Sequence, residues 1–156
     1  MDERANVTAY YEDWFYHRLQ RFVEETLPTT AALVHSKNLH ATFDAHTDFP
    51  RTLVETIRDD EKLTRKEKVE VITAVIGQWM NATTGSVWSI GPCASDSLTE
   101  RIGIGVKSTD GTSFFPLVPT VEDIVDQGAA DSSRLDLTIA LCESDRRHAK
   151  PSPNTH

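Results

Sequence analysis

The stretch TRKEKVEVITAVIGQWMN, residues 64–81, decides the fold. Thr64 followed three residues later by Glu67 is the capping-box pattern, which marks the start of a helix. Apolar residues then recur at helical spacing, so the sequence predicts a helix over 65–81. The inner face of this helix would carry Val69, Ile72, Ile76 and Met80. No other segment of the chain combines a start signal with so regular an apolar stripe.

Downstream of this helix the pattern changes to β structure. Residues 86–90, SVWSI, predict one short strand. Residues 100–108 and 112–118 predict a hairpin, because apolar residues alternate in the first strand and Asp110-Gly111 is a strong turn signal. Residues 134–142, RLDLTIALC, alternate in the same way and predict a last strand. Gly103 and Gly105 are interpreted as a close approach or a bulge in their strand.

Three further helices are expected. The first covers residues 8–26 and is closed by Pro28; the second covers 51–62, with Pro50 in its first turn. The third covers 120–127, with Thr120 as its cap and Gly128 as its stop. Residues 31–46 are ambiguous, and a hairpin over 32–44 is one interpretation.

The strands are grouped along the chain and do not alternate with helices, which favours an α+β fold with a mainly antiparallel sheet. At 156 residues the chain has the size of a single domain. We expect one globular domain over residues 1–142. Residues 143–156 contain two prolines and no large apolar side chain, so we expect a flexible polar tail there.

The composition indicates which partners and which cellular location are expected. The net charge is −8 and no half of the chain is basic, so a nucleic-acid partner has little support. The sequence has no run long enough to cross a bilayer, and its first residues are acidic and polar. We therefore expect a cytoplasmic protein with no membrane partner. Cys93 and Cys142 are expected to be buried thiols, with a single disulfide as the alternative.

A cluster of histidines and aspartates raises the question of a metal site. On an extended backbone, Asp44, His46 and Asp48 would share one face, with His40 or His35 as a further ligand. Two carboxylates beside an imidazole suit manganese or zinc. The alternative is a polar surface loop in which Asp48 caps the following helix.

The segment DAHTD, residues 44–48, resembles the Asp-Ala-His-x-Asp manganese-binding segment of the ureohydrolases, the arginase-type enzymes. The resemblance implies a two-metal centre that activates water, held by Asp44, His46 and Asp48, in a parallel α/β fold. The family's Gly-Gly-Asp-His and Asp-x-Asp-x-x-Asp segments do not occur in this chain, so the resemblance is confined to five residues.

Aromatic residues are concentrated in the first expected helix. Its apolar stripe consists of Tyr11, Trp14, Phe15, Leu19, Phe22 and Val23, while Tyr10 and Tyr16 lie on its flanks. Aromatic side chains are enriched at interfaces, so Tyr10, Tyr11, Trp14 and Tyr16 are candidate contact residues for a homodimer or for another protein. The alternative is that one flank packs under a loop of the same chain.

Three functional hypotheses follow. The favoured one is a small acidic, non-enzymatic protein that takes part in protein–protein interaction, as an assembly or accessory protein, without a cofactor. The alternative is a divalent-metal-binding domain or metal-dependent hydrolase that uses Asp44, His46 and Asp48. The third is a small-molecule sensor with a pocket between the sheet and the first helix.

Overall fold

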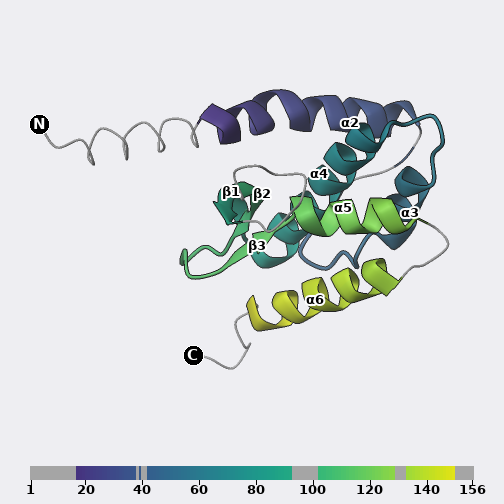
Figure 1. Ribbon diagram of the computed structural model, residues 1–156. Helices are drawn as coiled ribbons and strands as arrows, with labels where there is room; N and C mark the ends of the chain where they lie inside the picture. The colour runs from purple at the N-terminus through teal and green to yellow at the C-terminus, as the bar shows by residue number, and fades with distance from the viewer. Residues whose placement is uncertain (1–16, 38, 40–41, 93–101, 129–132, 150–156) are drawn as a thin grey trace, which may run out of the picture.

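The computed structural model describes residues 17–37, 39, 42–92, 102–128 and 133–149, and it has an α+β fold (Figure 1). Residues 17–21 are helical. The elements that follow are η1 (Phe22–Thr26), α2 (Leu27–Ser36), α3 (Arg51–Arg58), α4 (Arg65–Thr84), β1 (Val87–Pro92), β2 (Ile102–Lys107), β3 (Phe114–Pro116), α5 (Val118–Gln127) and α6 (Ser133–Ala149).

Helix α4 is the centre of the fold. The predicted capping box is confirmed: Thr64 Oγ1 accepts from the Glu67 backbone N–H, and Glu67 Oε1 accepts from the Thr64 N–H. Every residue from 71 to 77 is buried. An α-helix with no exposed face must be covered on all sides by other elements. The predicted inner face is therefore only part of the buried surface.

A tryptophan joins α4 to the segment before α3. Trp79 is fully buried, and its Nε1–H donates to the Thr47 carbonyl at 2.8 Å. Its ring also packs edge-on against Phe49 at 5.3 Å between centroids. Because a buried indole N–H needs a partner, this bond fixes where the chain passes before α3 begins. Leu53, Val54 and Ile57 of α3 then face the core.

The described strands form one antiparallel sheet in the order β1-β2-β3. Trp88 pairs with Val106 in β2, and Val106 pairs with Phe115 in β3. These three side chains belong to or pack against the core that surrounds α4. The predicted turn at Asp110-Gly111 is confirmed, with Gly111 at a φ of 75°. The hairpin prediction therefore holds, with β3 shorter than expected.

Two aromatic rings lie directly on glycines. A Cβ at position 77 would be 2.1 Å from the Trp88 ring, so α4 and β1 approach this closely only because residue 77 is glycine. The Phe114 ring covers Gly91 and Gly105 on the other face of the sheet. The interpretation of Gly105 as a point of close approach is confirmed.

The prediction that Pro28 closes the first helix is wrong, because the helix continues to Ser36. Proline lacks an N–H and its ring crowds the carbonyl four residues earlier. Just before Pro28 the bonding widens to a π turn, in which the Leu27 N–H bonds to the Phe22 carbonyl. We call residues 17–36 the N-terminal helix. It also covers residues 32–36, the first part of the hairpin expected over 32–44. Residues 8–16 of the predicted helix lie outside the described residues.

The strand predicted over 134–142 is also wrong, because these residues belong to α6. Helical spacing places Leu135, Thr138 and Cys142 on one buried face, against α4 and α5. Leu, Ala, Arg and Glu are good helix formers, so the local sequence permits a helix, and packing of the buried face against α4 and α5 stabilises it over the strand. Since α6 continues to Ala149, the tail boundary predicted at residue 143 falls inside a helix.

Helix boundaries differ from the predictions by a few residues. Helix α3 ends at Arg58, before the expected residue 62. Helix α5 starts at Val118, so Thr120 is not a cap and instead donates its hydroxyl to the Pro116 carbonyl. Gly128 ends α5 as predicted, at a φ of 63°.

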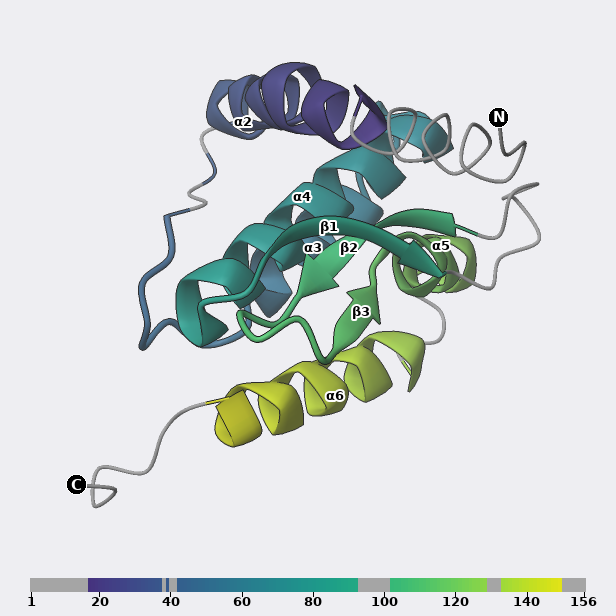
Figure 2. The same cartoon turned by 90° about the vertical axis from the view of Figure 1, so that its left-hand side faces the viewer.

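The N-terminal helix and α6 lie on opposite sides of the body formed by α3, α4, α5 and the sheet (Figures 1 and 2). Phe22 attaches the N-terminal helix to this body by packing edge-on against Trp88, at 4.8 Å between centroids. Leu135 and Cys142 attach α6 on the other side. Cys142 is buried as predicted, whereas Cys93 lies outside the described residues. Each of these two helices thus leaves its outer face to solvent.

We expect Gly77→Ala to lower the free energy of unfolding by about 1–3 kcal/mol, because the added methyl group overlaps the Trp88 ring. In an ordinary helix the same change would stabilise the protein by about 1 kcal/mol. Denaturant unfolding measures the difference. Trp88→Leu is the matched background, in which Gly77→Ala should cost much less. Equal stability of Gly77→Ala and the wild type would contradict the close contact.

Candidate functional site

Of the three proposed metal ligands, Asp44 and His46 belong to a turn that closes at Thr47, and Asp48 follows this turn, so the backbone over 44–47 is not extended as the metal-site prediction assumed. The Thr47 N–H donates to the Asp44 carbonyl, and the Asp44 carboxylate accepts from the His46 N–H at 2.8 Å and from the Thr47 hydroxyl at 3.1 Å. The His46 N–H bond is the main cause that lowers the pKa of Asp44. Residue 48 is not the cap of α3, since Pro50 occupies that position.

Among the described residues, no three His, Cys, Asp or Glu side chains form a group that could hold a metal ion. Asp44, His46 and Asp48 are all exposed. His35 is on α2, and His40 lies outside the described residues. Asp44, His46 and Asp48 therefore do not form a group of three that could hold a metal ion.

The predicted contact residues Tyr10, Tyr11, Trp14 and Tyr16 also lie outside the described residues. Of the same apolar stripe, the structure describes Leu19, Phe22 and Val23. Phe22 packs against Trp88, whereas Val23 points outward and is 40% exposed. The described end of the stripe is thus only partly covered by the body.

The outer face of α6 carries the most concentrated apolar exposure among the described residues. Leu137 and Leu141 are one turn apart and are 51% and 49% exposed. Arg134 precedes them and Ser144 follows them, at spacings of three, four and three residues along the helix. This is the spacing of the contact stripe in helix pairs. We call these four residues the α6 stripe.

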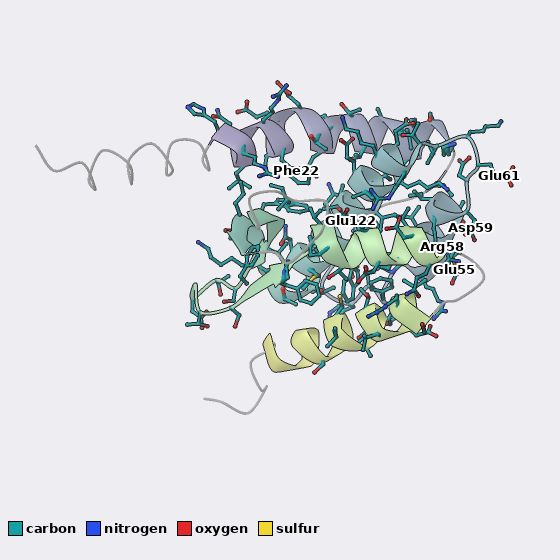
Figure 3. The ribbon with its side chains drawn as sticks, in the orientation of Figure 1. Phe22, Glu55, Arg58, Asp59, Glu61 and Glu122 are labelled. Atoms are coloured by element: carbon teal, nitrogen blue, oxygen red, sulfur yellow. The ribbon has the colours of Figure 1, made fainter. Side chains whose placement is uncertain are left out.

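A cavity of about 460 Å³ lies beneath the N-terminal helix. Arg18, Phe22 and Thr26 of this helix form one wall, and residues of α4, β2 and α5 form the rest. Phe22 points toward the body and Glu122 points toward the N-terminal helix (Figure 3). We call this space the Thr73 cavity, after a residue of α4 that lines it. It lies where the third hypothesis placed a pocket, between the sheet and the first helix.

An ion-pair cluster borders the Thr73 cavity. Arg65 Nη2 lies 3.1 Å from Glu122 Oε2, and Arg65 Nε lies 2.7 Å from Asp126 Oδ1. The Asp126 carboxylate, followed by that of Glu122, raises the pKa of Arg65 above its ordinary value. Glu122 is buried, so the guanidinium supplies the charge that a buried carboxylate requires.

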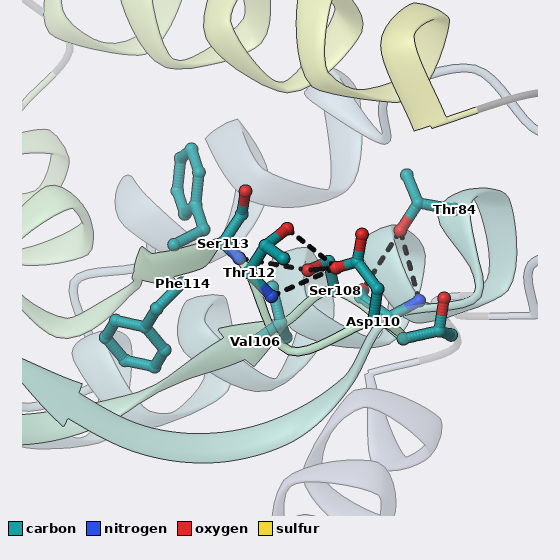
Figure 4. A pocket seen from close by; sticks show the side chains of 10 residues that line it. Thr84, Val106, Ser108, Asp110, Thr112, Ser113 and Phe114 are labelled. Carbon is teal, nitrogen blue, oxygen red and sulfur yellow. Dashed lines mark hydrogen bonds between the residues drawn. The ribbon is translucent and has the colours of Figure 1, made fainter.

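Two smaller hollows also lie among the described residues. One, of about 260 Å³, lies between α2 and α4 and is lined by His35 and Gln78. The other, of about 340 Å³, lies beside the β2–β3 turn and is rich in hydroxyl groups (Figure 4). Asp110 accepts there from Ser108 Oγ and from the N–H and hydroxyl of Thr112. These polar groups serve the turn itself.

Comparisons of the chain with protein-family models, with curated proteins and with solved structures find no match. Within the described residues, no helix is both long and apolar enough to cross a membrane. A functional proposal for this chain therefore depends on its own surfaces and cavities.

The Asp110 turn gives a prediction for acid stability. The Thr112 N–H, together with the Ser108 and Thr112 hydroxyls, lowers the pKa of Asp110 from 3.8 to about 2. A carboxylate whose pKa is lower in the folded state stabilises the protein above its unfolded pKa, and this contribution is lost as the pH falls toward the folded pKa. We expect Asp110→Asn to lower the melting temperature at pH 7, and the difference from wild type to shrink between about pH 4 and pH 2.

Calorimetry at a series of pH values measures this difference. Asp123→Asn is the matched control, because Asp123 is an exposed carboxylate on α5, away from the turn. The control should show a smaller effect at neutral pH. A difference between Asp110→Asn and wild type that stays constant down to about pH 2 would contradict the role of the ionised carboxylate.

Proposed function

We propose that this chain is a small non-enzymatic interaction protein that associates with a second copy of itself through the α6 stripe. The observation that carries the proposal is the exposed pair Leu137 and Leu141 on the outer face of α6. Two large apolar side chains one turn apart lose contact with water when a second helix covers them.

The residues at the ends of the stripe support a second copy as the partner. In an antiparallel pair that places Leu137 opposite the Leu141 of the other copy, Arg134 comes opposite Ser144. The long side chain of Arg134 then lies against the short side chain of Ser144. The two-fold symmetry of the pair places the same contact at both ends, so the α6 stripe is complementary in size to a second copy of itself. A parallel arrangement would instead place the two Arg134 guanidinium groups together.

The aromatic residues of the N-terminal region provide a second expected contact. Tyr10, Tyr11, Trp14 and Tyr16 remain candidates for binding to another protein, and the partly exposed Val23 continues their stripe. The N-terminal helix and α6 lie on opposite sides of the body (Figures 1 and 2). Val23, at the described end of this stripe, is therefore on the other side of the body from the α6 stripe.

Sedimentation at increasing protein concentration tests self-association. We expect the wild type to form a concentration-dependent dimer and Leu141→Glu to stay monomeric, because a buried carboxylate at the centre of the pair would be unpaired. Val87→Glu is the matched control, since Val87 is 48% exposed but lies on β1. This control should dimerise like the wild type.

A change of charge at Ser144 tests the antiparallel geometry. Ser144→Glu should strengthen the dimer, because each new carboxylate lies opposite the Arg134 of the other copy, and Ser144→Arg should weaken it. Adding Arg134→Glu to Ser144→Arg restores opposite charges and should recover most of the affinity. In a parallel pair, residue 144 of one copy would lie opposite residue 144 of the other. Both changes at Ser144 would then weaken the dimer, because each would place two like charges together.

Two results would contradict self-association through α6. One is a wild type that is monomeric at every concentration. The other is a dimer that Trp14→Ala abolishes and Leu141→Glu leaves intact, which would place the contact in the aromatic N-terminal region.

A further inference from the structure

The hollow beside the β2–β3 turn contains a carboxylate oxygen that the turn does not use. The hydrogen bonds that Ser108 Oγ, the Thr112 N–H and Thr112 Oγ1 donate to the Asp110 side chain all end on Oδ1. Oδ2 forms no hydrogen bond or ion pair with another described residue, and no dashed line reaches it in Figure 4. We call this hollow, of about 340 Å³, the Asp110 cleft.

The electrostatic surroundings of the Asp110 cleft favour a cation. Asp110 is the only charged residue among the described residues that line it. Bonds from Thr112 and Ser108 lower the pKa of Asp110 to about 2, so its carboxylate is ionised at neutral pH. Thr84 and Ser86 place the cleft at the C-terminal end of α4, whose last turn contains no basic residue. The negative end of the helix dipole therefore adds to the charge of Asp110.

The polar groups of the cleft suit an ammonium group better than a metal ion. Among the described residues, no three His, Cys, Asp or Glu side chains gather that could hold a metal ion. An ammonium group has only donors, so it requires several acceptors. Besides Asp110 Oδ2, the hydroxyl groups of Thr109 and Ser113 line the cleft and form no hydrogen bond within the described part of the chain.

Apolar side chains line the cleft as well. Val106 and Phe115 occupy paired positions in β2 and β3, and Phe114 precedes Phe115 in the same strand. A volume of about 340 Å³ lies within the range of roughly 300–1,000 Å³ that is typical of small-molecule sites. Apolar walls with a few convergent polar groups are the usual composition of such a site.

We propose that the Asp110 cleft binds a small organic amine in its protonated form, with the ammonium group at Asp110 and the apolar body against Val106, Phe114 and Phe115. The ammonium group donates to Asp110 Oδ2 and to the hydroxyl oxygens of Thr109 and Ser113. No residue of the α6 stripe is among the described residues that line the cleft, so amine binding and self-association are tested separately.

Phenethylamine is a suitable probe. We expect NMR titration of the full chain to show saturable shifts of the amide signals of residues 108–113, with a Kd of roughly 1 mM or tighter. Phenethyl alcohol is the matched neutral control, because a hydroxyl replaces the ammonium group, and hydrocinnamate has the same ring and linker with the opposite charge. Both controls should bind at least about tenfold more weakly. Absence of saturable shifts in this turn, or binding of either control as tight as that of the amine, would overturn the proposal.

Asp110→Asn separates a ligand-binding carboxylate from a structural one. The amide keeps the shape of the side chain and removes the charge, so phenethylamine binding should weaken by about tenfold while phenethyl alcohol binding stays the same. A carboxylate that only supports the turn would weaken both probes equally, and this result would overturn the proposal. Asp123→Asn is the matched control and should bind the amine as the wild type does.

A second variant tests the site without changing Asp110. Thr109 is exposed and its hydroxyl has no partner in the described chain, so we expect Thr109→Lys to fold as the wild type does. The new side chain brings an ammonium group of the protein itself to Asp110, and phenethylamine binding should weaken by at least about tenfold. Thr52→Lys adds the same charge at an exposed position on α3 and should bind the amine normally. Wild-type amine binding by Thr109→Lys would overturn the proposal.

Discussion

Helix α4 is buried on every side over residues 71–77, and the rest of the described structure is arranged to cover it. A helix of this kind cannot be stable alone, because its apolar surface must be removed from water by other elements. Helices α3, α5 and α6, the N-terminal helix and the sheet each contact α4. The capping box at Thr64 and the left-handed Gly85 fix where this central element begins and ends.

The elements around α4 do not pack against it equally closely at every position. At Gly77 the fit is so close that a methyl group would not be accommodated against Trp88. At Thr73, one turn earlier, the hydroxyl is buried without a hydrogen-bond partner among the described residues, and a cavity lies next to this residue. Protein interiors are normally close-packed and their polar groups are normally hydrogen-bonded, so the arrangement at Thr73 carries a cost in free energy.

The α6 stripe and the cavity beneath the N-terminal helix lie on opposite sides of the body. On one side, the α6 stripe combines two exposed leucines with ends that fit a second copy in size. On the other side, the N-terminal helix covers a cavity of mainly apolar lining and is attached there through Phe22. The small-molecule-sensor hypothesis assumed a pocket between the sheet and the first helix, but no residue pattern in the sequence pointed to this cavity. The α6 stripe was not, because a strand over 134–142 placed all its leucines on one face.

The sequence by itself determined the helix over 65–81, its cap, the hairpin turn at Asp110-Gly111 and the α+β class, because each depends on interactions between residues close in the chain. Tertiary structure decided the rest. Leu135, Leu137, Ile139 and Leu141 alternate as in a strand, yet packing against α4 and α5 made them helical and turned two of them outward. Pro28 carries a stop signal, yet a π turn lets the helix continue over the body. Local signals are weak in free energy, and burial of a whole element against its neighbours outweighs them.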